Sequence, residues 1–399
     1  MIPNLFINCR TDENNPDYEI LTSRREPLYE RDNDVRGIFE RDYTRILHSL
    51  GYRRLKHKTQ VFYNVGNDHI CTRMEHVSHV ESVSTVIAEF MGLSSELTRA
   101  IAAGHDIGHA PFGHQGERVL DKISYEKTGK KFWHEQNGLI FVDNIETLEN
   151  YNGQFQPLNL TYAVRDGIIS HCGEVDENGI KPRKEYIDLA EFTRPGQFQP
   201  ATWEACVVKI SDKIAYLGRD IEDALRLGIL SESEKNDLCE IVDSPVLNTT
   251  VIMNNLVSEI CRCSNPDTGI CLGKKSLELM NNIKLFNYKH IYSSAELDPF
   301  GKYSNLILNQ LFETLHASYC ESETLERLMN VSGKGRDLSR SFANWLSRYC
   351  GLSLHEDYLC ENIFGNLETV EQYDDAIIKF ISGMTDAYAI NSFNNLITF

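Results

Sequence analysis

Apolar residues recur at steps of three or four positions along most of the chain, the spacing that predicts amphipathic helices. One such helix is expected over 72–91, where Gly92 can end it. Ser94 is a suitable N-cap for a second helix, which we expect to break at Gly108. A third, long helix is expected over 201–227. Its apolar stripe consists of Val207, Ile210, Ile214, Leu217, Ile221 and Leu225.

Strand-like alternation is scarce along the chain. The best examples are the runs at 60–63 and 186–189, while further helices are expected near His114 and over 132–148. We find no internal repeat, and no stretch has the composition of a linker between domains. The pattern therefore predicts a mainly α fold, preceded by a charged, proline-containing lead-in over about 1–35.

Charge limits the classes of function that the sequence allows. The chain has 58 acidic and 40 basic residues, which give a net charge of −18. This balance argues against a general nucleic-acid-binding protein, because such a protein needs a broad basic face. An anionic substrate remains compatible, since a pocket needs only a local cluster of positive groups. With 41% hydrophobic residues the chain can bury a core, which excludes a disordered or fibrous protein.

Cysteine usage and the lack of targeting signals indicate a compartment. The 11 cysteines are odd in number and irregularly spaced, as is typical of reduced thiols in the cytosol. The N-terminal residues lack a basic segment followed by an apolar one, and no run of about 18 apolar residues occurs. We therefore expect a cytoplasmic protein without a secretory signal or a membrane span.

Histidines and carboxylates on the predicted helices point to chemistry. His76 lies on the first helix and Asp212 on the long one, and the adjacent pair His105 and Asp106 stands where the second helix ends. Taken singly, each is also compatible with an ordinary polar helix position. Together, two imidazoles and two carboxylates can converge on one divalent cation and leave room for water and substrate. Such mixed ligands suit Mn²⁺, Fe²⁺, Mg²⁺ or Ni²⁺ better than a closed structural zinc site.

A segment rich in glycine strengthens this interpretation. Residues 104–117 read GHDIGHAPFGHQGE and place His105, His109 and His114 around a tight turn. The glycines let the backbone come close to a ligand, and Pro111 restricts the turn. Titratable groups clustered at a helix end often mark a functional site, so we interpret this segment as part of an active site.

Six segments of the sequence form a series that covers about residues 41–226. They read RDYTRILHSLGYRRLKHKTQVF at 41–62, TRMEHVSHVESV at 72–83, GHDIGHAPFGHQGERVL at 104–120, FWHEQNG at 132–138, LNLTYAVRDGIISH at 158–171 and SDKIAYLGRDIEDAL at 211–225. In this order they resemble the HD-domain deoxynucleoside triphosphate triphosphohydrolases, the dGTPase family. The resemblance implies an N-terminal arm (1–40), an HD-type helical catalytic core (41–230) and additional C-terminal helices packed on the core (231–399).

The resemblance implies a metal-dependent, cytoplasmic enzyme that hydrolyses deoxynucleoside triphosphates, dGTP or several dNTPs, to deoxynucleoside and inorganic triphosphate. Its metal ligands would be His76, His105, Asp106 and Asp212. His114 would be the catalytic histidine, held and polarised by Glu117. It would either protonate the leaving 5′-oxygen or relay a proton to the attacking water. We expect Mn²⁺ or Mg²⁺ as the metal, with Fe²⁺, Ni²⁺ or Zn²⁺ as alternatives.

The resemblance also implies four residues that would bind the triphosphate. Arg73, one turn before His76 on the same helix, would contact and orient the α-phosphate. His109 and His134 would line the phosphate pocket. Lys213 would neutralise phosphate charge, although many relatives carry an acidic residue at that position.

Three further residues would select the sugar if the resemblance holds. Tyr216 would pack where a ribonucleotide carries its 2′-hydroxyl, while Asp220 and Gln60 would bind the 3′-hydroxyl. The resemblance further suggests a homo-oligomer, a tetramer or hexamer, with a second nucleotide or single-stranded DNA as a candidate activator. Two other functions stay open: an HD phosphohydrolase with another nucleotide substrate, and a dNTP-binding sensor without turnover.

Overall fold

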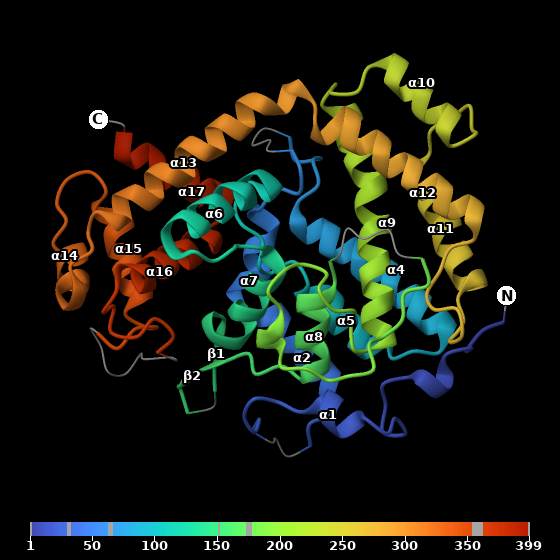
Figure 1. Cartoon of the computed structure of the whole chain (residues 1–399), viewed down its shortest axis with the longest axis horizontal. Helices are drawn as coiled ribbons and strands as arrows, with labels where there is room; N and C mark the ends of the chain where they lie inside the picture. The colour runs from blue at the N-terminus through green and yellow to red at the C-terminus, as the bar shows by residue number, and fades with distance from the viewer. Residues whose placement is uncertain are drawn as a thin grey trace. The chain divides into compact units, whose positions relative to one another are not determined.

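The computed structural model is mainly helical, which confirms the fold class expected from the hydrophobic pattern (Figure 1). The residues that it describes are 2–29, 33–62, 67–150, 152–172, 178–352 and 362–397. Within them there is one sheet, made of two antiparallel strands, β1 (Thr147–Glu149) and β2 (Phe155–Pro157). Leu148 pairs with Gln156 at the centre of this sheet.

The chain divides into two compact units whose segments alternate along the sequence. The first unit comprises Met1–Thr44, Asn64–His105 and Leu160–Pro299. The second unit comprises Arg45–Tyr63, Asp106–Asn159 and Phe300–Phe399. Because one boundary between the units falls between His105 and Asp106, the predicted ligands His76, His105 and Asp212 belong to the first unit. Asp106 belongs to the second.

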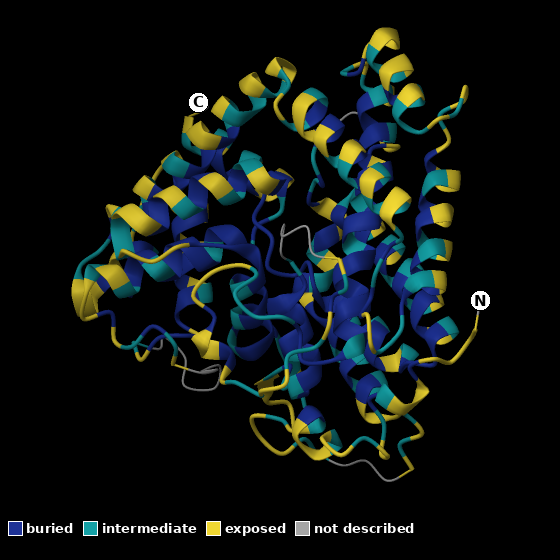
Figure 2. Cartoon of the chain, turned by 45° about the vertical axis from the view of Figure 1, so that its right-hand side comes forward, coloured by how far each residue is buried: buried dark blue, intermediate teal, exposed yellow. Residues whose placement is uncertain are grey.

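Four helices form the centre of the first unit, and Figure 2 shows that many of their positions are buried. They are α4 (Arg73–Met91), α5 (Ser95–Gly104), α8 (Tyr162–Ser170) and α9 (Trp203–Arg226). Helix α4 packs against α5 and α9, and α5 also packs against α8. The other elements of this unit are η1 (Ile7–Cys9), α1 (Tyr18–Thr22), most of α2 (Ile38–His48), η4 (Leu189–Glu191), α10 (Glu232–Ile241), α11 (Thr249–Cys263), α12 (Lys274–Asn287), η5 (Tyr288–Tyr292) and η6 (Ala295–Leu297).

Local capping sets the ends of α4 and the start of α5. The Thr72 side chain and Glu75 form a capping box at the first turn of α4. Gly92 ends the helix in the left-handed conformation with a φ of 83°, which glycine adopts without a steric penalty. The Ser94 hydroxyl then accepts a hydrogen bond from the Leu97 amide and caps α5. The helix over 72–91 and its two flanking signals are confirmed.

The register of α9 is fixed by burial along one face. The predicted apolar positions from Val207 to Ile221 are at most 4% exposed, and each buried aliphatic side chain contributes about 1.5–3 kcal/mol.

At the start of the helix, the buried Glu204 carboxylate accepts hydrogen bonds from the Thr11 amide (3.0 Å), the Thr11 hydroxyl (2.9 Å) and the Ser94 amide (3.0 Å). These bonds join the N-terminal arm and the start of α5 to α9.

The second unit is built from shorter helices and the small sheet. Helix α6 (Gly113–Thr128) packs against α16 (Val370–Ser382). The other elements are α3 (Leu50–Arg54), η2 (Leu55–His57), α7 (His134–Ile140), the π turn η3 (Phe141–Ile145), most of α13 (Asp298–His316), η7 (Glu321–Glu323), α14 (Thr324–Met329), α15 (Arg336–Leu346) and α17 (Asp386–Ile397).

Residues near the C-terminus hold the turn that precedes α6. The Asp386 carboxylate accepts hydrogen bonds from the Phe112 amide (2.9 Å) and the Thr59 amide (3.0 Å). The buried Lys58 ammonium donates to the carbonyl of His109 and to the carbonyl of Ser382 (2.9 Å). A buried charge is stable only when it is well hydrogen-bonded, so these contacts fix the backbone of the turn.

Three expected elements differ from the structure. The helix over 132–148 begins at His134 and ends in the π turn at Ile145, and Leu148 belongs to β1. The second helix ends at Gly104, before the expected break at Gly108. The strands at 60–63 and 186–189 are wrong for their described residues: 60–62 and 186–188 are bends or irregular, and Leu189 begins η4. Tyr63 lies outside the described residues. At Leu148 the pairing with Gln156 outweighs the local helical pattern.

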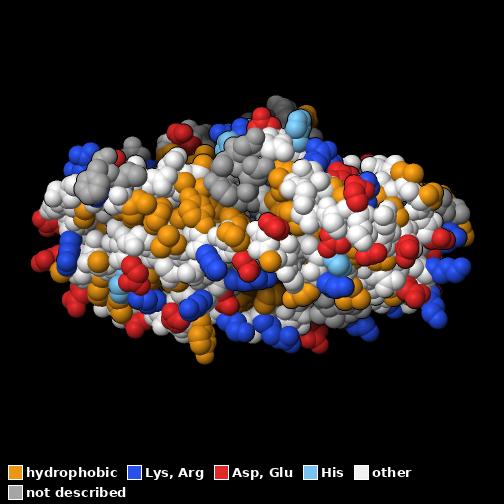
Figure 3. Space-filling view, turned by 90° about the horizontal axis from the view of Figure 1, so that it is seen from above, with side chains coloured by type: hydrophobic (Ala, Val, Ile, Leu, Met, Phe, Trp, Pro, Cys, Tyr) orange, Lys and Arg blue, Asp and Glu red, His pale blue; other side chains and the backbone are white. Residues whose placement is uncertain are grey.

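Acidic and basic side chains both occur across the face shown in Figure 3, and several basic ones gather at its lower centre. This mixture agrees with the net charge of −18. Among the described helices, none combines the length and the apolar character that crossing a bilayer requires.

Candidate active site

Three predicted metal ligands meet in the first unit. His76 on α4, His105 at the end of α5 and Asp212 on α9 place one ligand atom each within 4.8 Å of the others. Asp212 Oδ1 lies 2.9 Å from His76 Nε2 and 3.9 Å from His105 Nε2. The two imidazoles are at most 2% exposed and the Asp212 side chain is 16% exposed. This trio can hold one divalent cation through two nitrogens and one oxygen.

A backbone hydrogen bond orients the His105 ring. Its Nδ1 lies 2.7 Å from the carbonyl oxygen of Ala102, and a carbonyl can only accept a hydrogen bond. Nδ1 therefore carries a proton, which leaves Nε2, 3.9 Å from Asp212 Oδ1, as the nitrogen suited to bind a metal. This arrangement is characteristic of metal-binding histidines, whose second nitrogen donates to a carbonyl or carboxylate.

His171 repeats this arrangement, and the sequence analysis assigned it no role. It follows α8 as His105 follows α5, and its Nδ1 lies 2.7 Å from the carbonyl of Ile168. Its ring packs edge-on against the ring of His105, with the centroids 4.9 Å apart. The signal in the sequence was the same in both cases: a histidine directly after the last turn of an apolar helix.

The histidines control the charge of Asp212. Burial alone would raise the pKa of this carboxyl group, because it disfavours the ionised form. The hydrogen bond and charge of His76, together with the charges of His105 and His171, outweigh burial and hold the pKa well below its usual range. Asp212 is therefore a carboxylate at neutral pH, as a metal ligand must be.

A second cluster lies in the second unit, on the turn between α5 and α6 and at the start of α7. The ligand atoms of Asp106, His109 and His134 lie within 4.8 Å of one another, and all three residues are buried. His109 Nε2 is 3.0 Å from Asp106 Oδ1. The rings of His109 and His134 are stacked with centroids 3.7 Å apart and an angle of 18° between their planes. The two residues predicted to line the phosphate pocket are thus neighbours.

Glu117 on α6 connects this cluster to His114. Its carboxylate accepts from the backbone amide of His134 (2.8 Å) and lies 2.9 Å from His134 Nδ1. His114 Nδ1 is 3.4 Å from the other oxygen, the contact that the resemblance led us to expect. The His114 side chain is 55% exposed, so its ring is open to solvent. Glu117 therefore contacts two histidines, and its contacts with His134 are the shorter ones.

The charge of Glu117 is fixed by its neighbours. Burial raises the pKa of the carboxyl group, but the charge of His134, the hydrogen bonds from His114 and His134 and the charge of His109 oppose it. Their sum lowers the pKa well below its usual value, so the side chain stays ionised at neutral pH.

Close backbone contacts explain the glycines of the turn. A Cβ on Gly108 would lie 2.0 Å from the carbonyl oxygen of His134, so only glycine allows α7 to begin against this turn. Gly113 has a φ of 58°, and a Cβ there would meet the carbonyl oxygen of Gln60 at 2.7 Å. The predicted residue Gln60 is thus buried beside the start of α6.

The remaining predicted residues lie on α4 and α9. Arg73 is the first residue of α4 and is 1% exposed, one turn from His76. On α9, Lys213 is 8% exposed and Tyr216 is half-buried, one turn beyond Asp212.

Asp220, a further turn along α9, has a partner that the sequence did not reveal. The hydroxyl of Tyr292 in η5 donates a short hydrogen bond to its carboxylate. Burial and the Asp220 charge raise the pKa of Tyr292 well above its usual value, so the phenol keeps its proton. Tyr292 falls in the part of the chain where the family resemblance is loose, and no motif marked it.

The fold and the buried His–Asp cluster define the class of protein. Residues 73–217 match the model of the HD domain family, and this span contains the whole trio and the adjacent pair His105–Asp106. The HD domain is a metal-dependent phosphohydrolase fold, and the donor set described above is of the kind that holds a divalent metal.

Longer comparisons give the particular family. The chain is 32% identical to a protein of Caldanaerobacter subterraneus subsp. tengcongensis over 84% of its own length and 89% of that protein. A protein of Rickettsia felis is 30% identical over 94% of this chain and 96% of its own. One of Clostridium tetani is 31% identical over 83% and 88%. All three are named deoxyguanosinetriphosphate triphosphohydrolase-like proteins, and the chain belongs to this family of HD-domain hydrolases.

Proposed function

We propose that the protein hydrolyses deoxynucleoside triphosphates at the α-phosphorus, releasing deoxynucleoside and inorganic triphosphate. The observation that carries this proposal is the buried trio of His76, His105 and Asp212, next to the cationic residues Arg73 and Lys213 in sequence. The names of the relatives support the choice of substrate.

The trio, with Asp106 as the residue after His105, would hold the metal. Asp212 is ionised and His105 presents Nε2, so the donor set suits a divalent ion such as Mn²⁺ or Mg²⁺, or alternatively Fe²⁺, Ni²⁺ or Zn²⁺. When bound, such an ion would polarise a phosphoryl oxygen and lower the pKa of a water molecule.

The side chains would bind the triphosphate and move one proton. Arg73 is suited to bidentate contact with phosphate oxygens, because its guanidinium presents paired donors. Lys213 would offset a further negative charge. Water attacks the α-phosphorus and releases a proton to solvent, the bond to the 5′-oxygen breaks, and His114 donates a proton to that oxygen. Its Nδ1 lies beside the ionised Glu117, so Nε2 would carry the transferred proton.

The sugar would be recognised along α9. Tyr216 and Asp220 lie four residues apart and so share one face of the helix. The Tyr292 hydroxyl donates to the Asp220 carboxylate and supports it, and a carboxylate is an acceptor suited to a 3′-hydroxyl. Tyr216 would exclude a 2′-hydroxyl, and Gln60 would assist at the 3′-position.

The test is a product analysis with each dNTP and with GTP, in Mn²⁺ and in Mg²⁺. Equal amounts of triphosphate and deoxynucleoside, with little product from GTP, are expected. Release of pyrophosphate or of a monophosphate would refute the proposed reaction and favour another HD phosphohydrolase. Binding of dNTP without any product, in both metals, would identify a sensor instead.

A further inference from the structure

Cys263 and Cys271 stand at the two ends of the short turn that connects α11 to α12. Within this turn, Asn265 and Gly269 form an antiparallel bridge, and the amide of each donates to the carbonyl of the other (3.3 and 2.8 Å). Positions at equal distances from an antiparallel bridge lie across from each other. Cys263 and Cys271 are both two positions outside this bridge, so the turn brings the two cysteines together.

Side-chain contacts confirm that the two cysteines are neighbours. Cys271 Sγ lies 3.2 Å from the backbone carbonyl oxygen of Cys263. The Ser264 hydroxyl accepts a hydrogen bond from the Cys271 amide (2.9 Å), which holds the two sides of the turn together. Cys263 Sγ lies on the same side, because a Cβ on Gly273 would be 3.5 Å from it. A disulfide spans the distance between directly opposed residues, so this backbone already suits a bond between the sulfurs.

The third cysteine of this region, Cys261, is not part of the pair. It is 7% exposed, and burial raises the pKa of its thiol to about 11. It also lies two positions before Cys263 on α11, and side chains two positions apart on a helix do not face each other. Cys263 and Cys271 are both partly exposed, so small molecules in solution can reach them.

Glu259 gives the two thiols different roles. The Cys263 thiol donates a hydrogen bond to Glu259 Oε1 (3.3 Å), and burial together with this carboxylate raises the pKa of Cys263. A raised pKa leaves less of the reactive thiolate. Cys271 Sγ instead faces the Thr268 hydroxyl (3.8 Å) and a carbonyl oxygen, neither of which carries a charge. Cys271 is therefore suited to attack first, and Cys263 to close the bond while Glu259 accepts its proton.

We propose that Cys263 and Cys271 are a redox-active pair, which a small-molecule disulfide oxidises to an intramolecular disulfide. Cys271 attacks one sulfur of the small disulfide and releases one small thiol, which leaves a mixed disulfide on the protein. Cys263 then attacks the Cys271 sulfur, and the second small thiol leaves. The two protein thiols lose two electrons and two protons, and the small disulfide takes up both to become two thiols. The pair is separate from the proposed hydrolysis and does not depend on it.

The new bond closes the base of a loop that pairs with another segment of the first unit. Ile180 and Ile270 each donate a backbone hydrogen bond to the other (2.9 Å), and the Leu272 amide donates to Asn178 Oδ1 (2.8 Å). A cross-link at the base of the loop restricts its opening. Hydrogen exchange at the Ile180 and Ile270 amides should therefore slow in the oxidised chain.

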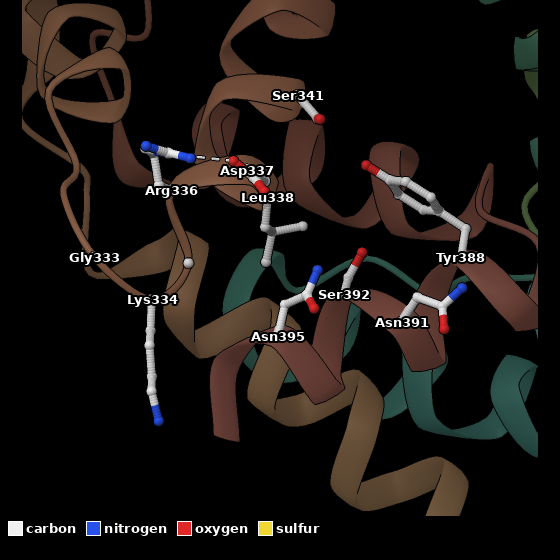
Figure 4. A pocket seen from close by; sticks show the side chains of 11 residues that line it. Gly333, Lys334, Arg336, Asp337, Leu338, Ser341, Tyr388, Asn391, Ser392 and Asn395 are labelled. Atoms are coloured by element: carbon white, nitrogen blue, oxygen red, sulfur yellow. Dashed lines mark hydrogen bonds and ion pairs between the residues drawn. The ribbon is translucent and has the colours of Figure 1, made fainter. Parts of the chain in front are cut away.

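The pocket shown in Figure 4 does not offer a second place for this reaction. It has a volume of about 530 Å³, lies in the second unit and is lined by the start of α15 and one face of α17. None of its lining residues is a cysteine, so a small disulfide that enters it meets no thiol to oxidise. The reaction depends on the turn after α11 and not on this cavity.

Mass spectrometry of the full chain after incubation with oxidised glutathione tests the proposal. Trypsin cleaves after Arg262 and Lys274, so both cysteines fall in one peptide, 263–274, while Cys261 falls in another. After the remaining thiols are alkylated, we expect this peptide to be lighter by two hydrogen atoms and free of alkyl groups. Two alkyl groups on the peptide, or glutathione on both of its cysteines, would overturn the pair.

The chain unfolded in urea is the reference for the effect of the fold. Against reduced glutathione, the folded chain should retain the bond at least about tenfold better than the unfolded chain, because the turn holds the two thiols opposite each other. Equal retention in urea would overturn the proposal, since any two cysteines so close in sequence would then behave in the same way.

Single variants separate the two roles. C263S should accumulate the mixed disulfide on Cys271, whereas C271S should take up glutathione on Cys263 several-fold more slowly. C320S is the matched control, because it removes another partly exposed cysteine and should leave the bond unchanged. E259Q should slow the closing step several-fold with little change in the first step. Equal glutathione uptake by C263S and C271S refutes the order of attack, and an unchanged closing rate in E259Q refutes the role of Glu259.

Discussion

Replacement of Glu117 by glutamine removes one negative charge and one acceptor from the contacts with His114 and His134. The carboxylate now accepts from the His134 amide at 2.8 Å and lies 2.9 Å from His134 Nδ1 and 3.4 Å from His114 Nδ1. The glutamine side chain has nearly the same shape, but its single oxygen can serve only some of these donors, and its NH₂ group cannot accept. The change therefore tests electrostatics and leaves packing almost unchanged.

The size of the effect follows from these contacts. A hydrogen bond that involves a charged group contributes about 1.5–3 kcal/mol, and losing one such bond should destabilise the protein by that amount at pH 7. Since His114 loses the carboxylate that orients it as a proton donor, kcat should fall about 100-fold, within the usual range for general acid–base catalysis. The effect on kcat should exceed the effect on KM, because Glu117 contacts His114, the proposed proton donor.

Stability as a function of pH gives a second readout. The pKa of Glu117 is depressed in the folded protein, so its stabilisation is complete above the ordinary value of 4.5 and is lost as the pH falls through the folded-state pKa. Urea unfolding between pH 3 and pH 7 should therefore show a smaller acid-induced loss of stability in E117Q than in the wild type.

The matched control is E126Q on the same helix. The Glu126 side chain is 58% exposed and is 3.9 Å from Lys122, so its removal should change stability by less than about 0.5 kcal/mol. Wild-type kcat in E117Q would refute the role given to Glu117. Loss of bound metal in parallel with kcat would show that the variant disturbs the trio instead.

Other predictions concern the metal, the sugar and the fold. H105A should lose its metal and all activity, whereas H114A should keep the metal and lose turnover. Elemental analysis after dialysis measures the metal, and product release measures turnover. Equal metal loss in both variants would contradict this division of roles. Y292F should raise KM for dNTP several-fold more than it lowers kcat, because it removes the hydrogen bond to Asp220. An unchanged KM would argue against a role of Asp220 in binding the sugar. E204A should destabilise the protein by about 3 kcal/mol, measured by urea unfolding, because it leaves three buried donors unpaired; a change below about 0.5 kcal/mol would contradict the structural role of this carboxylate.

Local signals predicted the helices that carry the site, and burial then placed the ligands. The capping box at Thr72 and the glycine at position 92 act within one turn, so α4 could be predicted almost to the residue. The meeting of His76 and Asp212 could be expected because both lie on helices with buried apolar positions at helical spacing, and such positions pack into a common core. Their positions relative to the metal and substrate stay predictions.

Other features depend on contacts that no short pattern contains. The role of His171 appears only when the ends of α5 and α8 are seen to bring two equally oriented imidazoles together. The prediction of a helix over 132–148 was wrong at its C-terminal end. The apolar residues there fit a helix as well as a strand, and the pairing of Leu148 with Gln156 makes this end a strand. The bond from Tyr292 to Asp220 joins elements separated by three other helices in the chain, α10, α11 and α12.

The hydrogen bonds from Lys58 and Asp386 have a consequence for how the protein is made. The turn that contains His109 and Phe112 receives its backbone partners from Lys58 and Asp386, which lie 51 and 274 positions away in sequence. Contacts of such high sequence separation form late in folding, after the chain has paid the entropy of closing a long loop. On the ribosome, this turn cannot adopt its final conformation until residue 386 has emerged, since the carboxylate that holds it does not yet exist. The turn that carries the histidine cluster of the second unit can thus be completed only after residue 386 has been synthesised.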